Sequence, residues 1–191
     1  MTAGTARHPR SRRRARIVVA GFSILGLAAL AWASLASPLP RLTYNPSASM
    51  AVGWYRIDPT FNRADLQHGA VRVGRTVLVR LPIEAAALAA QRGYLPADVP
   101  LLKRVGAVAP QHICMVGRSV RIDDVLVAAA LSADRMGRPL PSWQQCRRLV
   151  SGEVFLLSTT DPASFDSRYF GPVAASAVIG VAHTVWSETG R

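Results

Sequence analysis

The sequence predicts a mainly β fold, in which an N-terminal transmembrane helix precedes an exported domain of short strands with one small helix. Three observations lead to this prediction. Residues 17–36 form an apolar run without a charge. Prolines and glycines divide the chain beyond it into short segments. Most of those segments are rich in β-branched residues, and residues 84–91 are rich in alanine.

The apolar run is long enough to cross a membrane, since twenty helical residues span roughly 30 Å. Six arginines and no acid precede it, and such charge stays in the cytoplasm. We therefore expect a basic cytoplasmic tail (1–16), an anchor in the inner membrane (17–37) that ends at Ser37–Pro40, and an exported domain (38–191). A cleaved signal peptide is the alternative, although its apolar region spans only about 7–15 residues.

The alternation of apolar and polar residues, and the prolines and glycines that interrupt it, predict the remaining elements. Strands are expected at 53–58, 71–81, 101–108, 153–159 and 174–186, a hairpin at 112–122 turning near 117–118, and a helix at 84–91 closed by Gly93. Loops are expected at 60–70 and 134–142 and a compact turn at 164–172, and the segment 124–131 is ambiguous between helix and strand.

The net charge of +12 permits a nucleic-acid-binding module. That function is disfavoured, because half of the excess lies in the N-terminal tail and basic and aromatic residues do not alternate on one strand. The two cysteines, Cys114 and Cys146, are too few for a metal site without clustered histidines. In an oxidising compartment they can form a disulfide, and two free buried thiols are the alternative.

One lysine stands among 22 arginines, and this suggests a role that arginine cannot fill. A buried lysine can lose its proton, whereas arginine cannot. On a strand, Lys103 shares a face with Leu101, Val105 and Ala107, which would disfavour the ammonium and lower its pKa. The alternative is a lysine whose ammonium reaches water. The chain has no Gly-x-Ser-x-Gly, Ser-x-x-Lys or His-Glu-x-x-His motif and no glycine-rich phosphate loop, which leaves a serine paired with this lysine.

Three short segments resemble the conserved boxes of type I signal peptidases. Pro46-Ser47-Ala48-Ser49-Met50 resembles their Pro-Ser-Gly-Ser-Met box, Lys103-Arg104-Val105 resembles their Lys-Arg-Val strand, and residues 164–171 resemble their Ser-x-Asp-Ser-Arg-Tyr-Trp-Gly box. The resemblance is closer to the TraF-type conjugative-transfer peptidases. The segments that match their motifs are Asn45 with Ser49 to Tyr55, Leu102–Val105, Gly137–Pro141 and Ser164–Pro172. Ala51 and Ala109-Pro110-Gln111 depart from that pattern, and the second departure leaves the turn after the lysine strand open.

The resemblance implies a role for each matching residue. Ser49 would be the nucleophile and Lys103 the general base, and the backbone N–H of Ser49 and the hydroxyl of Ser47 would form the oxyanion hole. Ser164 would orient the lysine, and Asp166 and Arg168 would pair to hold their box in place. An apolar groove near Met50, Val52 and Trp54 would receive the substrate and touch the membrane.

The expected function is therefore a membrane-anchored serine endopeptidase that needs neither metal nor cofactor. Its substrate would be an exported precursor with small residues before the cut, such as a pro-pilin or another conjugation or secretion component. Two other functions stay open: a non-catalytic bitopic scaffold of a transfer or secretion complex, and a general secretory signal peptidase.

Overall fold

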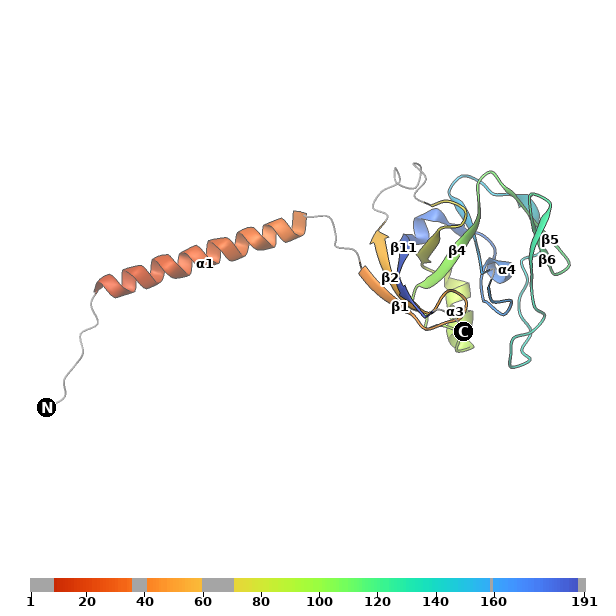
Figure 1. Cartoon of the computed structure of the whole chain (residues 1–191), viewed down its shortest axis with the longest axis horizontal. Coiled ribbons are helices and arrows are strands. Elements are labelled where there is room, and N and C mark those ends of the chain that lie inside the picture. The colour runs from red at the N-terminus through yellow and green to blue at the C-terminus, as the bar shows by residue number, and fades with distance from the viewer. Residues whose placement is uncertain (1–8, 36–40, 60–70, 159, 189–191) are drawn as a thin grey trace. The chain divides into compact units, whose positions relative to one another are not determined.

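The computed structural model describes residues 9–35, 41–59, 71–158 and 160–188 (Figure 1). Contacts divide the chain into two units, Met1–Leu39 and Pro40–Arg191, and each unit is described by itself. The expected loop at 60–70 and the expected helix end at Ser37–Pro40 lie outside the described residues.

The first unit holds helix α1 (Pro9–Leu35). Its segment Arg13–Trp32 has a mean hydropathy of 1.9 and is, by length and composition, able to cross a membrane. The side chains of residues 13–32 are all exposed, so this unit buries none of that apolar surface against the protein. An apolar helix with exposed side chains fits a membrane anchor, because lipid would cover the surface that a soluble fold must bury.

Seven strands form the larger sheet of the second unit. They are β1 (Arg41–Asn45), β2 (Gly53–Pro59), β11 (Val178–Ser187), β3 (Thr76–Val79), β4 (Leu101–Val108), β9 (Glu153–Leu157) and β10 (Val173–Ala174), in that spatial order, with every neighbouring pair antiparallel. Short connections explain the pairing of β1 with β2, whereas β11 reaches the centre of the sheet from the far end of the chain.

A four-stranded antiparallel sheet lies on the other side of the same unit (Figure 1). Its order is β7 (Val125–Ala129), β6 (Ser119–Ile122), β5 (His112–Val116) and β8 (Cys146–Arg148). The hairpin of β5 and β6 turns at Gly117, whose positive φ favours glycine. The helices among the described residues of this unit are α3 (Ile83–Gln91), the short α4 (Ser167–Phe170) and a 3-10 turn (Ala175–Ala177).

The core of the second unit lies on both faces of β4 and β9. Val105, Leu156 and Val79 pack in one cluster, and Ala107, Phe155 and Leu157 join Ile113 and Tyr169 in another. A bulge between Val105 and Ala107 lets β4 supply both clusters. The buried strands therefore fix the position of every side chain on β4.

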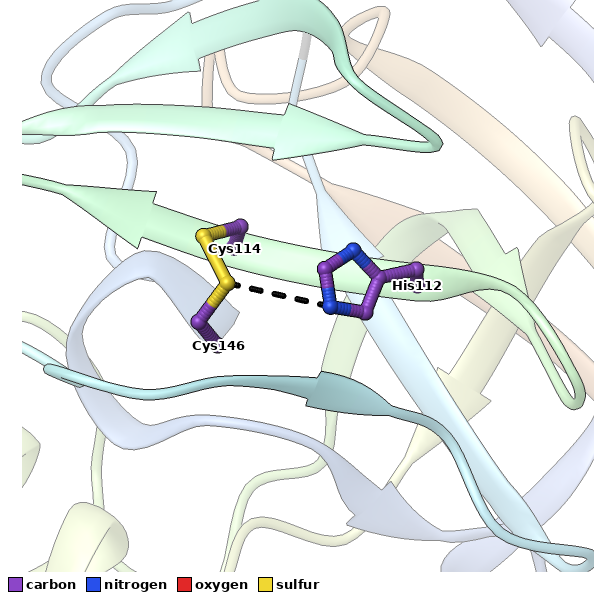
Figure 2. The surroundings of a disulfide bond; sticks show 3 residues. All are labelled: His112, Cys114 and Cys146. Carbon is purple, nitrogen blue, oxygen red and sulfur yellow. Dashed lines mark hydrogen bonds between the residues drawn. A yellow bond between two sulfur atoms is a disulfide. The ribbon is translucent and has the colours of Figure 1, made fainter.

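Cys114 and Cys146 form a disulfide, which confirms the pairing that the sequence left open (Figure 2). The two residues face each other in the register of β5 and β8. The ring of His112 lies beside the bond, with its Nε2 3.7 Å from the Sγ of Cys146. The disulfide joins the edge strand β8 to its sheet across 32 residues of sequence.

The sequence predicted most elements in place but erred at several ends. The strand expected over 71–81 is limited to Thr76–Val79, because residues 71–75 form turns. The ambiguous segment is the strand β7, and the compact turn contains the one-turn helix α4. The last strand begins at Val178 rather than 174, and β1 and β8 were not predicted.

The turn after β4, which the sequence left open, is closed by Gln111. Its backbone N–H donates to the carbonyl oxygen of Val108 at 3.0 Å. Its side chain accepts from the N–H of Val108 at 3.1 Å and donates to Asp123 at 2.9 Å. Gln111 thus pairs both the N–H and the carbonyl oxygen of Val108 in this turn, whose sequence departs from the TraF-type pattern.

Candidate functional site

The turn between β1 and β2 carries both serines, and Asn45 organises it from within. The side-chain amide of Asn45 donates to the carbonyl oxygens of Ser47, Met50 and Ala51, at 2.9, 3.2 and 3.0 Å. Asn45 is buried, so these bonds replace water that the turn carbonyls would otherwise need. At the end of the turn, Gly53 has a positive φ and lies so close to the carbonyl of Trp186 that a β-carbon would collide with it.

The hydroxyl groups of Ser47 and Ser49 are in direct contact. Their oxygens are 2.8 Å apart, and the hydroxyl of Ser47 also lies 3.1 Å from the side-chain oxygen of Asn45. Because Ser47 has a single hydroxyl proton and Asn45 offers only an acceptor there, Ser47 donates to Asn45 and accepts from Ser49. The nucleophile candidate therefore holds its proton toward Ser47 in this arrangement.

Lys103 is buried in the middle of β4, with 2% of its surface exposed. It is paired with Val77 of β3, and its neighbour Arg104 is exposed. Desolvation by burial lowers the pKa of Lys103 to about 8, against the opposing charges of Asp166 and Asp161. With this pKa about one lysine in ten is neutral at pH 7, compared with about one in a few thousand for a free lysine.

A cavity of about 700 Å³, which we call the main cavity, brings the separate sequence boxes together. Its lining includes Ser47 and Ser49 from the turn between β1 and β2, which we call the serine turn, and Lys103 from β4. It also includes Ser164 from residues 164–171, which we call the third box. Apolar side chains line much of the rest, among them Leu78, Leu81, Leu95, Leu102, Leu131, Leu140 and Phe165. Such a cavity is large enough for a short segment of a peptide, and its largely apolar lining disfavours the charged form of a buried amine.

The hydroxyl oxygen of Ser164 is buried and has no hydrogen-bond partner among the described residues. Buried hydroxyl groups without a partner are rare, since each costs about 1–3 kcal/mol. Ser164 lines the main cavity together with Lys103, and its hydroxyl oxygen is buried beside that cavity.

Asp166 and Arg168 form a buried ion pair that holds the third box. The guanidinium of Arg168 donates to both carboxylate oxygens of Asp166, at 2.9 and 2.8 Å. It also donates to the carbonyl oxygens of Ala129, Pro162, Asp161 and Ser164, at 3.0 to 3.3 Å. Arg168 thus fixes the backbone of Ser164 and ties the box to the end of β7.

Ser158, which the sequence analysis did not single out, connects this box to the serine turn. Its hydroxyl donates to the carbonyl oxygen of Ser49 at 2.8 Å, and its backbone N–H donates to Asp166 at 2.9 Å. A polar residue at the end of an apolar strand was the only signal in the sequence, and it does not reveal a partner 109 residues away.

The structure places the three expected groove residues away from the main cavity. Met50 lines a second, smaller cavity of about 170 Å³ with Tyr55 and Arg104. Trp54 is 45% exposed and lies against Tyr44, with their ring centroids 5.3 Å apart. Neither Val52 nor Trp54 is among the described residues that line either cavity.

Across residues 9–35, 41–59, 71–158 and 160–188, no three histidine, cysteine, aspartate or glutamate side chains are grouped so that they could hold a metal ion. The site offers three hydroxyl groups, one amine and one buried ion pair. They belong to Ser47, Ser49, Ser164, Lys103, Asp166 and Arg168. This set of groups can transfer protons and form an ester, which is the chemistry of a serine nucleophile with an amine base.

The family model described as "Signal peptidase, peptidase S26" matches residues 14–187. A plasmid transfer protein TraF of Escherichia coli is 31% identical over 178 residues, covering 87% of this chain and 91% of that protein. A second such protein of Escherichia coli is 38% identical over 97 residues, covering 49% of this chain and 55% of that protein. The probable conjugal transfer protein TraF of Sinorhizobium fredii is 32% identical over 181 residues, covering 91% and 92%. A solved signal peptidase I of Enterococcus faecalis has 17% identity and a TM-score of 0.33, covering 58% of this chain and 94% of that one.

Proposed function

The chain belongs to the signal peptidase family, peptidase S26, and on that premise we propose that it is a membrane-anchored serine endopeptidase with a Ser49–Lys103 dyad. One observation carries the proposal. The chain's single lysine is buried, has a lowered pKa, and lines the same cavity as Ser47, Ser49 and the buried hydroxyl of Ser164.

In the first half of the reaction, Lys103 acts as the general base. Its neutral amine takes the hydroxyl proton of Ser49, and the Ser49 oxygen attacks the carbonyl carbon of the scissile bond. The ammonium then returns that proton to the departing amine, which leaves an ester on Ser49. A water molecule hydrolyses the ester, with Lys103 again taking the proton, and the free serine is restored.

The negative charge of the tetrahedral intermediates falls on the former carbonyl oxygen. The backbone N–H of Ser49 and the hydroxyl of Ser47 donate to that oxygen in the proposed mechanism. Because Ser47 donates to Asn45 at rest, its hydroxyl must rotate toward the substrate. The energetic cost is small, since the hydrogen bond that Ser47 loses is replaced by one to a charged acceptor.

In the proposed mechanism, residues of the third box orient the dyad through hydrogen bonds. Ser164 accepts a hydrogen bond from the Lys103 amine and thereby orients it, which would give its buried hydroxyl a partner. Asp166 and Arg168 hold Ser164 through its backbone, and Ser158 holds the backbone of Ser49. Ser158, Asp166 and Arg168 are positioning residues, because none of them contacts the reacting atoms, whereas Ser164 contacts the amine that transfers the proton.

We place the catalytic domain on the outer face of the inner membrane. The apolar span Arg13–Trp32 supports an anchor, and the arginines before residue 17 favour a cytoplasmic N-terminus. The substrate is then an exported precursor that reaches the bilayer surface. The similarity to proteins named for plasmid and conjugal transfer supports a pro-pilin or another conjugation component as this precursor.

The test measures precursor processing by the full chain in membranes. Ser49→Ala and Lys103→Met each remove one member of the dyad, and both are expected to lower processing by at least about 10³-fold. Ser151→Ala and Arg80→Met are matched controls, since both residues are exposed and lie outside the site. A serine-reactive acylating probe should label the wild-type protein at Ser49.

Processing by the dyad variants at the wild-type rate would refute the proposal. An unlabelled wild-type protein that processes no precursor would instead favour the non-catalytic bitopic scaffold. Restoration of growth after depletion of the general signal peptidase would point to a general secretory enzyme.

A further inference from the structure

Part of the wall of the main cavity is a group of charged side chains that the proposed mechanism does not use. We call it the arginine cluster, defined as Arg92, Arg135, Arg138, Asp134 and Tyr94, all of which line the cavity. Arg92 and Tyr94 follow α3, and the other three belong to the loop between β7 and β8. Two segments that are distant in the sequence thus meet at one wall.

Asp134 is the centre of the cluster. Its carboxylate accepts hydrogen bonds from the hydroxyl of Tyr94, from Nε of Arg138 at 2.7 Å, and from the backbone N–H groups of Met136 and Arg138 at 2.9 Å. Burial opposes the charge, yet the hydrogen bonds from Tyr94 and Arg138 hold the pKa of Asp134 well below its usual range. Asp134 is therefore ionised, and it is already fully engaged.

Arg138 donates from Nε to Asp134 and from Nη2 to the carbonyl oxygen of Arg92, the latter at 3.1 Å. The side chain of Arg92 is only 17% exposed, and its contacts are long. Its Nη1 lies 3.5 Å from the hydroxyl of Tyr94 and 4.0 Å from the carboxylate of Asp134. A guanidinium carries five N–H donors, and no nitrogen of Arg92 is both buried and unpaired, so its remaining donors are accessible to a ligand.

The charges of the cluster do not balance. Three guanidinium groups face one carboxylate, which leaves about two positive charges on this wall. Arg135 is exposed, and Asp161 and Lys103 line the cavity elsewhere. The leucine-rich lining beside the cluster strengthens the field of its charges. This wall therefore attracts a group with negative charge.

From this arrangement we propose that the arginine cluster is a substrate subsite that binds a carboxylate of the peptide, either an aspartate or glutamate side chain or the C-terminal carboxylate. Arg92 and Arg135 supply the donors, and Asp134 holds Arg138 and Tyr94 in place. This proposal rests on the proposed function, because it names a feature of that enzyme's substrate.

A carboxylate is favoured over other occupants by the geometry of guanidinium groups. Their N–H donors match the two oxygens of a carboxylate and form pairs that are stronger than neutral hydrogen bonds. A neutral side chain would leave the donors of Arg92 to water and would gain no ion pair, so a ligand with a carboxylate is preferred. The apolar remainder of the cavity accommodates the small and aliphatic residues around the carboxylate.

The experiment uses the full chain in detergent micelles and alanine-rich fluorescent decapeptides. One series carries glutamate or glutamine at each position in turn, and a second series ends in a free carboxylate or an amide. Binding is measured by fluorescence anisotropy with Ser49→Ala, so that the readout does not depend on cleavage. Cleavage of the same peptides is measured with the wild-type protein.

We expect at least one acidic peptide to bind about tenfold more tightly than its neutral counterpart. The preference should disappear in Arg92→Gln/Arg135→Gln, which leaves the Asp134–Arg138 pair intact. It should persist in Arg118→Gln/Arg121→Gln, which removes the same charge from the β5–β6 hairpin outside the cavity. A preference confined to the glutamate series identifies a side chain, and one confined to the second series identifies the C-terminus.

Equal binding of the acidic and neutral peptides, or a preference that survives loss of Arg92 and Arg135, would overturn the subsite. The proposed peptidase has a separate readout. Cleavage that requires Ser49 but ignores charge refutes only the subsite, whereas selective binding without Ser49-dependent cleavage refutes only the peptidase.

Discussion

The hydroxyl of Ser158 donates a hydrogen bond of 2.8 Å to the backbone carbonyl oxygen of Ser49. The N–H of Ser158 is in turn held by Asp166, which is paired with Arg168. A continuous chain of hydrogen bonds therefore runs from the third sequence box to the backbone of the proposed nucleophile. In this series of hydrogen bonds, the third box does not contact Ser49 directly. It acts on the serine turn through Ser158, which follows β9.

Replacing Ser158 by alanine should lower both stability and catalysis. The variant loses the bond to Ser49 and the bond that the hydroxyl accepts from the N–H of Asp161 at 3.2 Å, each worth about 1 kcal/mol of folding free energy. It also frees the carbonyl of Ser49 and lets the nucleophile shift. We expect kcat to fall about tenfold with KM nearly unchanged, measured on a peptide substrate. Thr160→Val is the comparison, because the hydroxyl of Thr160 lies 3.5 Å from the same carbonyl and should matter less. Equal loss in both variants would contradict the role of Ser158.

Replacing Lys103 by methionine should abolish catalysis and stabilise the fold. The pKa of Lys103 is about 8 in the folded chain and 10.5 in the reference state, so the unfolded chain binds the extra proton more strongly. Below pH 8 this difference destabilises the wild-type protein by about 3 kcal/mol, and the penalty fades as the pH rises from 8 to 10.5. Methionine carries no such penalty.

Thermal unfolding at several pH values measures this effect. The midpoint of Lys103→Met should exceed that of the wild type by about 6–12 °C at pH 7, given about 2–4 °C per kcal/mol for a chain of this size. The gap should narrow toward pH 10. A gap of constant size would mean that packing, rather than the buried charge, separates the two proteins.

The rate of cleavage should follow the neutral form of Lys103. Because burial lowers the pKa of Lys103 to about 8, kcat/KM should rise with pH up to about 8 and then level off. Initial rates on a fluorescent peptide between pH 5.5 and 9.5 give the profile. A rise that continues without levelling up to pH 9.5 would show that the amine is not desolvated in the working enzyme.

Exchanging Arg168 for lysine should destabilise the domain severely despite the conserved charge. An ammonium cannot reproduce the two-pronged pair with Asp166 together with the four bonds to carbonyl oxygens. We expect a loss of about 3–5 kcal/mol in the free energy of unfolding, measured with denaturant.

Arg147→Lys is the matched control for this exchange. Arg147 also forms two bonds to one carboxylate, that of Glu153, but its side chain is 36% exposed. Exposed pairs contribute about 0–1 kcal/mol, so this variant should unfold almost as the wild type does. Equal losses at the two positions would mean that burial does not set the strength of the Arg168 pair.

Several parts of the fold followed from the sequence because they depend on local pattern. The strand at 101–108 and the helix near 84–91 were predicted nearly in place, since alternation and alanine content determine them. The shorter β3 shows the limit of this reasoning. Residues 71–75 carry the same valine-rich alternation, but β11 pairs only with Thr76–Val79, and β4 continues past them only through the bonds of Val105 to Gly74 and Arg75. Strand length is set by partners that lie elsewhere in the chain.

The site residues also divide into those that the local sequence revealed and those that only distant contacts revealed. The lone lysine and the two serines were visible as residue types, and their resemblance to known boxes suggested their roles. The bond from Ser158 to Ser49 and the meeting of Arg92 with Asp134 were not visible, because each joins segments that lie far apart in the sequence. No local pattern specifies which distant side chain will fill a given contact.

By itself, the sequence determined an apolar N-terminal helix, a β-rich domain and a family of serine and lysine boxes, since composition and short spacing carry that information. Only the tertiary structure decided that Lys103 is withdrawn from water, that the hydroxyl of Ser164 is buried beside the same cavity, and that arginines line its wall. The physical reason is that burial and charge balance belong to the packed arrangement of many strands, and a linear pattern records neither.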